Sequence, residues 1–258
     1  MGGYELSVPL TTRFASFDGT DLAVHRMGAG RPVLLLHGLF SSADMNWIRF
    51  GHAALLAEAG FEAIMPDWRA HGSSAAPRDP GAYPPDVLVR DACAMVEGLG
   101  LTDYDLVGFS LGARTAASAV IAGLKPSKLV LAGMGIEGLS NWQRRSAFFV
   151  DMIDRFDTIE RGDRAYMARQ FLKSMGTDRV AARLLLTQGV CDIAEADLAQ
   201  ITMPTLVLSG TEDRDNGSPE ALVQALPDAR MGEMPGTHMS CVTKPELGLA
   251  IRDFLQSA

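Results

Sequence analysis

The stretch DLVGFSLGAR, residues 105–114, decides the fold expected for this chain. It places Ser110 between Gly108 and Gly112 in a G-x-S-x-G pattern, which carries little weight alone in a chain with 26 glycines. However, an apolar strand-like run ends at Ser110, and a small-residue helical pattern, LGARTAASAVIAG, follows at once. A tight strand-to-helix turn explains both glycines and raises the serine hydroxyl to the carboxyl edge of a sheet. This context predicts a nucleophilic serine rather than a small residue retained only for packing.

The rest of the chain alternates short apolar runs with helical patterns. This alternation predicts an α/β fold, with a mostly parallel, doubly wound sheet flanked by helices. The runs expected to form its parallel strands are PVLLLHG (32–38), FEAIMPDW (61–68), YDLVGF (104–109), SKLVLAGMG (127–135) and PTLVLSG (204–210). Helices are expected at about 47–59, from Pro84 to about Leu99, and from Pro245 to about Leu255.

One region breaks the alternation. Residues 138–200 have helical periodicity throughout and contain no strand-like run. They are predicted to form a small helical cap inserted into a core made of residues 1–137 and 201–258.

A serine hydroxyl needs a base, usually a histidine that a carboxylate orients. Of the five histidines, His238 stands in the loop MPGTHMS (234–240), between the last short strand and the last helix. Asp213 follows the buried run LVLSG and is the best candidate for the carboxylate. Asp215 is its main rival, although a surface or helix-capping role suits Asp215 better, and Glu137 is a remote third candidate.

The oxyanion of an acyl-transfer reaction needs two donors. The backbone N–H of Leu111 directly follows the serine, and that of Leu39 lies in HGLF (37–40), just after an earlier strand. His37 in the same motif fits a structural hydrogen-bonding role better than that of a second base.

The stretch GMGIEG, residues 133–138, is a literal G-x-G-x-x-G after a strand. In a dinucleotide site an acidic residue would end the next strand about 20 positions later, where Asp154 and Asp157 stand. The intervening SAFFVDMIDRF has helical periodicity instead, so these glycines are interpreted as the exit from a strand into the cap.

Composition limits the remaining possibilities. The 258 residues carry a net charge of −8, which opposes binding to nucleic acid or a polybasic membrane contact. Three widely spaced cysteines fit neither a disulfide framework nor a zinc knuckle. The N-terminus lacks a signal-peptide pattern, and Leu6 stands where myristoylation needs Ser or Thr. The expectation is a cytoplasmic monomer or homodimer without cofactor or metal, acting on a small-molecule ester.

Taken together, the motifs LLLHG (34–38), PDWRAHGSS (66–74), VGFSLG (107–112), LVLSGTED (206–213) and GTH (236–238) resemble the α/β-hydrolase fold superfamily. The resemblance covers essentially the whole chain. It implies a catalytic triad of Ser110, Asp213 and His238, with the amides of Leu39 and Leu111 as the oxyanion hole. One departure is Ala70, because many relatives carry Arg-Gly-His-Gly where this chain has RAHG (69–72).

The resulting functional hypothesis is a serine esterase that forms an acyl-enzyme on Ser110. A lactonase or a carbon–carbon bond hydrolase could use the same triad, and a receptor-like binding role is a weaker alternative. A serine in place of an aspartate at position 110 disfavours the ester-enzyme mechanism of dehalogenases and epoxide hydrolases.

Overall fold

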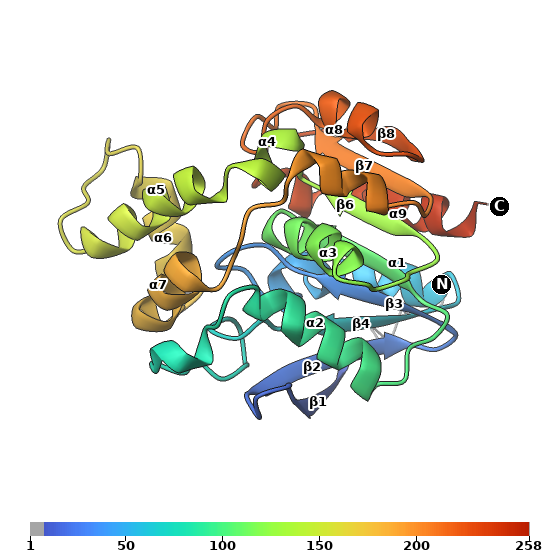
Figure 1. Cartoon of the computed structure of the whole chain (residues 1–258), viewed down its shortest axis with the longest axis horizontal. Helices are drawn as coiled ribbons and strands as arrows, with labels where there is room; N and C mark the ends of the chain where they lie inside the picture. Colours follow the sequence, from blue (N-terminus) through green and yellow to red (C-terminus); the bar gives the residue numbers. More distant parts are fainter. Residues whose placement is uncertain (1–7, 258) are drawn as a thin grey trace, which may run out of the picture.

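The computed structural model of the chain describes residues 8–257, so the interpretation of Leu6 lies outside the described part. Eight strands form one sheet in the order β1-β2-β4-β3-β5-β6-β7-β8 (Figure 1). Their bounds are β1 Leu10–Ala15, β2 Asp21–Gly28, β3 Arg31–Leu36, β4 Phe61–Pro66, β5 Asp105–Phe109, β6 Leu129–Ala132, β7 Thr205–Gly210 and β8 Ala229–Met234. The pairs β1–β2 and β2–β4 are antiparallel and the other five are parallel, which confirms the predicted fold class.

Helices cover both faces of this sheet. α1 (His52–Glu58) and α9 (Pro245–Gln256) pack together on one face, and α2 (Val87–Gly98) packs with α3 (Leu111–Ile121) on the other, where α8 (Pro219–Ala225) also lies. Every residue of β5, β6 and β7 is therefore buried, which explains why these strands read as continuous apolar runs. Within residues 8–257, no helix has the length and apolar character that a membrane crossing requires.

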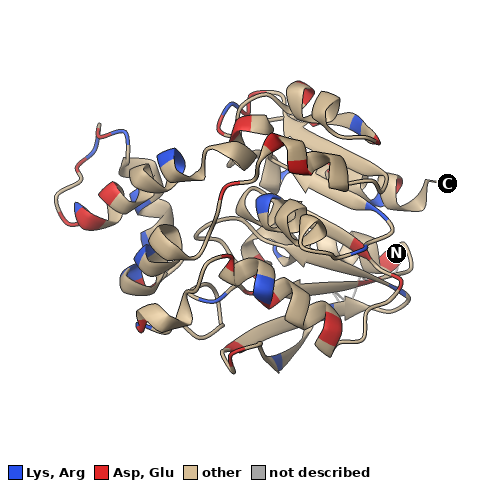
Figure 2. Cartoon of the chain, in the orientation of Figure 1, with Lys and Arg blue, Asp and Glu red and all other residues tan. Residues whose placement is uncertain are grey.

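Residues 138–200, called the cap segment below, lie between β6 and β7. Its helices are the end of α4 (Ile136–Ser140), α5 (Trp142–Asp154), α6 (Tyr166–Ser174), α7 (Arg179–Gln188) and the 3₁₀ helix η3 (Glu195–Gln200). α5, α6 and α7 project beyond the sheet (Figure 1), and acidic and basic residues are interspersed along them (Figure 2). Residues 133–204, all of them described, contain no strand beyond one isolated bridge. The exact boundaries at 138 and 200 stay a prediction.

Two predicted helices differ from the structure. The helix expected at 47–59 is divided into a π-helical turn, Asp44–Ile48, and α1, because Gly51 between them has a left-handed φ of +82°. The helix expected from Pro84 begins only at Val87. A residue that precedes a proline is disfavoured in the α region, and Asp86 has a φ of +54°.

Candidate active site

Ser110 occupies the sharp turn between β5 and α3. Its backbone has φ +53° and ψ −114°, a strained conformation for a non-glycine residue. A Cβ on Gly108 would lie 2.3 Å from the carbonyl carbon of Gly112, and a Cβ on Gly112 would lie 2.0 Å from the oxygen of Leu36. Both contacts are far closer than atoms tolerate, so only glycine fits on either side of this serine.

The three residues predicted to act together are adjacent in the structure. His238 Nε2 lies 2.9 Å from Ser110 Oγ, and His238 Nδ1 lies 2.7 Å from Asp213 Oδ2. The carboxylate faces Nδ1, so Nδ1 carries the proton and Nε2 is free to accept one from the serine hydroxyl. Burial alone raises the pKa of the Asp213 carboxyl, but its hydrogen bonds with His238 and the Asp215 N–H and the nearby Arg145 outweigh burial and leave that pKa below its usual value.

The two rival carboxylates have other contacts. Asp215 is exposed, and its backbone N–H donates to Asp213 Oδ1 at 2.9 Å, which supports the carboxylate it was expected to rival. Glu137 accepts a hydrogen bond from the backbone N–H of Ser218 at 2.8 Å. Among the described residues, Asp213 is the carboxylate that hydrogen-bonds to His238.

The same corner is the one place in residues 8–257 where three potential metal ligands gather. Ligand atoms of Asp213, Asp215 and His238 lie within 4.8 Å of one another. Both ring nitrogens of His238 already engage Ser110 and Asp213, so a metal ion there would have to replace one of these hydrogen bonds. The donor set therefore fits proton transfer better than metal binding.

The two amides predicted to bind an oxyanion flank Ser110. Leu111 begins α3, so its N–H has no intrahelical acceptor. A Cβ on Gly38 would lie 3.5 Å from Ser110 Cβ, which places the Gly38–Leu39 turn directly against the serine. The N–H of Gly38 donates to Asn46 and that of Phe40 to His71, whereas Leu39 and Leu111 donate to no acceptor in the described part of the chain.

Two buried histidines hold the turn that carries Leu39. His71 Nε2 accepts the Phe40 N–H at 3.0 Å while Nδ1 donates to Arg69 O, and His37 Nε2 accepts the Trp68 N–H at 3.0 Å. Burial lowers the pKa of both, that of His71 to about 3, so both are neutral acceptors. The role of His71 was missed; its place in RAHG was the available signal.

The buried, neutral His71 should make the free energy of unfolding depend on pH. The folded pKa of His71 lies below the unfolded value of about 6.5, so the unfolded chain binds the extra proton. The contribution is complete above pH 6.5 and is lost as the pH falls toward 3, at about 1.4 kcal/mol per pH unit. In urea unfolding, the free energy of unfolding of His71→Gln should depend less steeply on pH than that of the wild type between pH 4.5 and 6, by about that amount, and the two should run parallel above pH 7. Equal slopes for the two proteins would contradict this assignment.

The segment GMGIEG packs against the loop that follows Asp213. Asn216 Nδ2 donates to Gly133 O at 2.7 Å, and the Gly138 N–H donates to Asn216 O at 2.9 Å. A Cβ on Gly135 would lie 2.5 Å from the carbonyl carbon of Gly217. Asn216 is 5% exposed and was not predicted; the Asn-Gly step after Asp213 was its only local signal.

The first glycine of this segment also borders the histidine. Gly133 has φ +59°, and a Cβ there would lie 2.9 Å from the Phe109 ring and 3.2 Å from His238 Cε1. The Phe109 ring in turn packs against the His238 ring, with the two centroids 5.1 Å apart. The glycines of GMGIEG thus have packing reasons of their own, which agrees with their interpretation as the strand exit.

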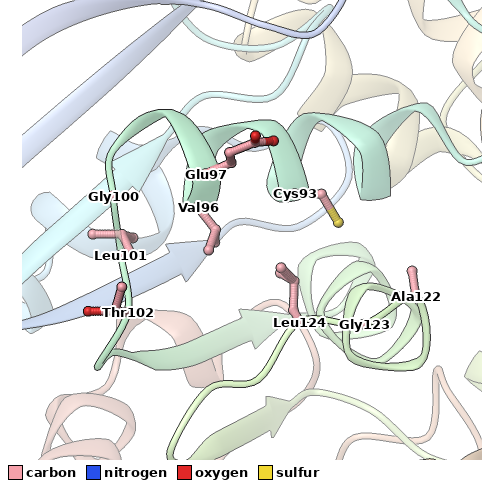
Figure 3. Close-up of a pocket in the computed structure, with 9 residues that line it drawn as sticks. All are labelled: Cys93, Val96, Glu97, Gly100, Leu101, Thr102, Ala122, Gly123 and Leu124. Carbon is pink, nitrogen blue, oxygen red and sulfur yellow. The ribbon is translucent and has the colours of Figure 1, made fainter.

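A hollow of about 420 Å³ lies elsewhere, between the C-terminal ends of α2 and α3 (Figure 3). Cys93 and Leu124 are among its lining residues, and none of the three hydrogen-bonded residues above lines it. Burial raises the pKa of the Cys93 thiol, which makes it a poor nucleophile. This hollow therefore adds nothing to the chemistry at Ser110.

Comparison with known proteins gives a family and several relatives. The model of the "Alpha/beta hydrolase family" matches residues 33–248. A non-heme haloperoxidase of Rhodococcus erythropolis is 27% identical over 263 aligned positions, covering 89% of this chain and 93% of that protein. An epoxide hydrolase of Caballeronia sordidicola is 36% identical over 104 residues, but the match spans only 40% of this chain and 31% of that protein.

Among solved structures, an esterase from Thermogutta terrifontis is 25% identical, with a TM-score of 0.71 and coverage of 96% of this chain and 98% of that one. The family match extends from β3 into α9, and the sheet order and the turn at Ser110 agree with it. The chain is therefore a member of the alpha/beta hydrolase family.

Proposed function

We propose that this protein is a serine hydrolase that cleaves small carboxylic esters through an acyl-enzyme on Ser110. The observation that carries the proposal is the hydrogen-bonded chain from Ser110 Oγ through His238 to Asp213, at 2.9 and 2.7 Å. Such a chain supplies the base that a neutral hydroxyl needs in order to attack a carbonyl.

In the proposed reaction, Ser110 Oγ attacks the ester carbonyl while His238 Nε2 takes the hydroxyl proton. The negative charge that forms on the carbonyl oxygen is stabilised by the N–H groups of Leu39 and Leu111. Collapse of the tetrahedral intermediate expels the alcohol, which leaves with the proton from His238. Water, activated by the same nitrogen, then cleaves the acyl-enzyme and releases the acid.

The shared triad and the names of the relatives define the alternatives. A lactone, or a substrate with a cleavable carbon–carbon bond, would use the same three residues. Haloperoxidase activity is a second candidate, because the relative with that name aligns along 89% of this chain. Epoxide hydrolysis through an ester-enzyme on a carboxylate is disfavoured, because position 110 holds serine.

A covalent probe tests the proposal directly. Incubation with a fluorophosphonate should add one phosphonyl group by intact-mass spectrometry, and peptide mapping should place it on Ser110. Ser110→Ala should remain unlabelled, whereas Ser118→Ala, two turns along the same helix, should label like the wild type. Hydrolysis of p-nitrophenyl acetate and butyrate is measured in parallel with bromide-dependent halogenation. Absence of both labelling and ester hydrolysis in the wild type would refute the esterase proposal.

A further inference from the structure

Arg114 lies one helical turn after Ser110 in α3 and is buried, with 1% of its surface exposed. Its backbone N–H donates to Ser110 O at 3.0 Å, so the two residues belong to the same first turn of the helix. A buried arginine is costly unless acceptors surround it. The identity of those acceptors therefore indicates what this residue does.

The acceptors come from two places in the cap segment, one at its start and one near its end. On the outgoing side, Arg114 Nη1 donates to Gly138 O at 2.7 Å and to Leu139 O at 2.5 Å. On the returning side, Nη2 donates to Cys191 O and to Asp192 Oδ1, the latter at 3.3 Å. One planar guanidinium thus joins two chain segments that are about 50 residues apart, which a lysine ammonium reproduces poorly.

The same cluster fixes the start of α5. The guanidinium carbon of Arg114 lies 5.4 Å from the ring centroid of Trp142, the first residue of that helix. The backbone N–H of Trp142 donates to Asp192 Oδ1 at 2.5 Å, which is the oxygen that also accepts from Arg114. The orientation of α5 is therefore set where it leaves the core.

From that point α5 contacts both sides of the site. Arg145 donates to Asp215 O, on the loop that holds Asp213. Phe149, one turn further on the same helical face, packs edge-on against Phe40 with centroids 5.5 Å apart. Phe40 follows Leu39, so α5 reaches from the Asp213 loop to the proposed oxyanion turn.

We propose that Arg114 is a positioning residue that sets how α5 lies against the Asp213 loop and Phe40 and thereby determines which acyl groups the site accepts. The part of this inference that concerns acyl groups rests on the proposed ester hydrolysis. The part that concerns the position of α5 does not. The reacting ester bond meets Ser110 and the two amides, whereas in this proposal a longer acyl chain extends toward α5, which borders the oxyanion turn through the Phe149–Phe40 contact. Loss of the Arg114 contacts should therefore affect long acyl chains more than the chemical step.

Two variants that should remain folded test this proposal. Arg114→Lys keeps the charge but cannot reach all acceptors, and Asp192→Ala removes the oxygen shared by Arg114 and Trp142 from a half-exposed position. Arg69→Lys is the matched control, because Arg69 is equally buried but donates only to Asp18, Asp91 and Ala82 O in the core.

Each variant is assayed with p-nitrophenyl acetate and octanoate after active-site titration. Arg114→Lys should raise KM for octanoate about tenfold and change KM for acetate by less than about threefold, with a smaller shift of the same sign in Asp192→Ala. Trypsin should cut residues 142–188 of both variants about tenfold faster than in the wild type, below the melting temperature of the core. Arg69→Lys should change neither the KM ratio nor the site of cleavage.

An unchanged KM ratio together with unchanged cleavage in Arg114→Lys and Asp192→Ala would overturn the inference. A uniform loss of kcat for both esters would also overturn it, because that result indicates a general structural role. The proteolysis does not depend on catalysis. If the wild type hydrolyses no ester, the proposed function fails, and the cleavage rates alone still decide whether Arg114 fixes the cap segment.

Discussion

Ser110→Ala is expected to lower kcat for p-nitrophenyl butyrate by about 10⁴- to 10⁶-fold, with KM changed by less than about threefold. The substitution removes the one oxygen that His238 Nε2 contacts at 2.9 Å, and water in its place has neither the position nor the activation. Alanine is smaller than serine by one oxygen and introduces no clash in the turn, so the fold should persist.

Pre-steady-state and steady-state hydrolysis of the purified variant, with circular dichroism to verify folding, would measure this effect. Ser118→Ala provides the matched control on α3 and should retain the wild-type rate. A folded Ser110→Ala protein with the wild-type kcat would exclude the acyl-enzyme mechanism, whatever the behaviour of the probe.

Asp213→Asn should lower kcat by about 10⁴-fold while Asp215→Asn stays within about threefold of the wild type. An asparagine amide can donate to His238 Nδ1, which moves the ring proton to Nε2 and removes the acceptor for the Ser110 hydroxyl. Asp215 acts on Asp213 through its backbone N–H, which the Asn variant keeps.

Each substitution is nearly isosteric with the wild-type residue and removes one negative charge. Each variant therefore serves as the control for the other. Values of kcat are compared over a pH range from 6 to 9, because Asp213 has a lowered pKa and stays ionised throughout it. A mild effect at Asp213 with a severe one at Asp215 would reverse the assignment.

The sheet was predictable because its central strands are buried on both faces. In β5, β6 and β7 this burial produces largely apolar runs, and those of β5 and β7 end just before Ser110 and Asp213. The glycines beside Ser110 were predictable for the same local reason, since the turn leaves no room for a Cβ. The break at Gly51 was missed because apolar spacing continues across it.

The choice between Asp213 and Asp215 could not be made from local sequence. Both follow the same strand, and the contact that separates them joins Asp213 to a histidine 25 positions away. Arg114 and Asn216 were missed for a related reason. Their partners lie 24 or more positions away. Nothing near Arg114 in the sequence marks it as different from a surface side chain, and the Asn-Gly step was the only local signal for Asn216.

The acceptors around Arg114 have a consequence for protein engineering. Three of the four oxygens are main-chain carbonyls, those of Gly138, Leu139 and Cys191, so they do not depend on side-chain chemistry, although position 138 has no room for a Cβ. Only Asp192 contributes a side chain. These contacts fix where the chain leaves and re-enters, whereas Trp142, Arg145 and Phe149 of α5 keep side-chain roles of their own. We expect the cap of another family member to be graftable onto this core if it supplies the Arg114 acceptors at positions 138–139 and 191–192.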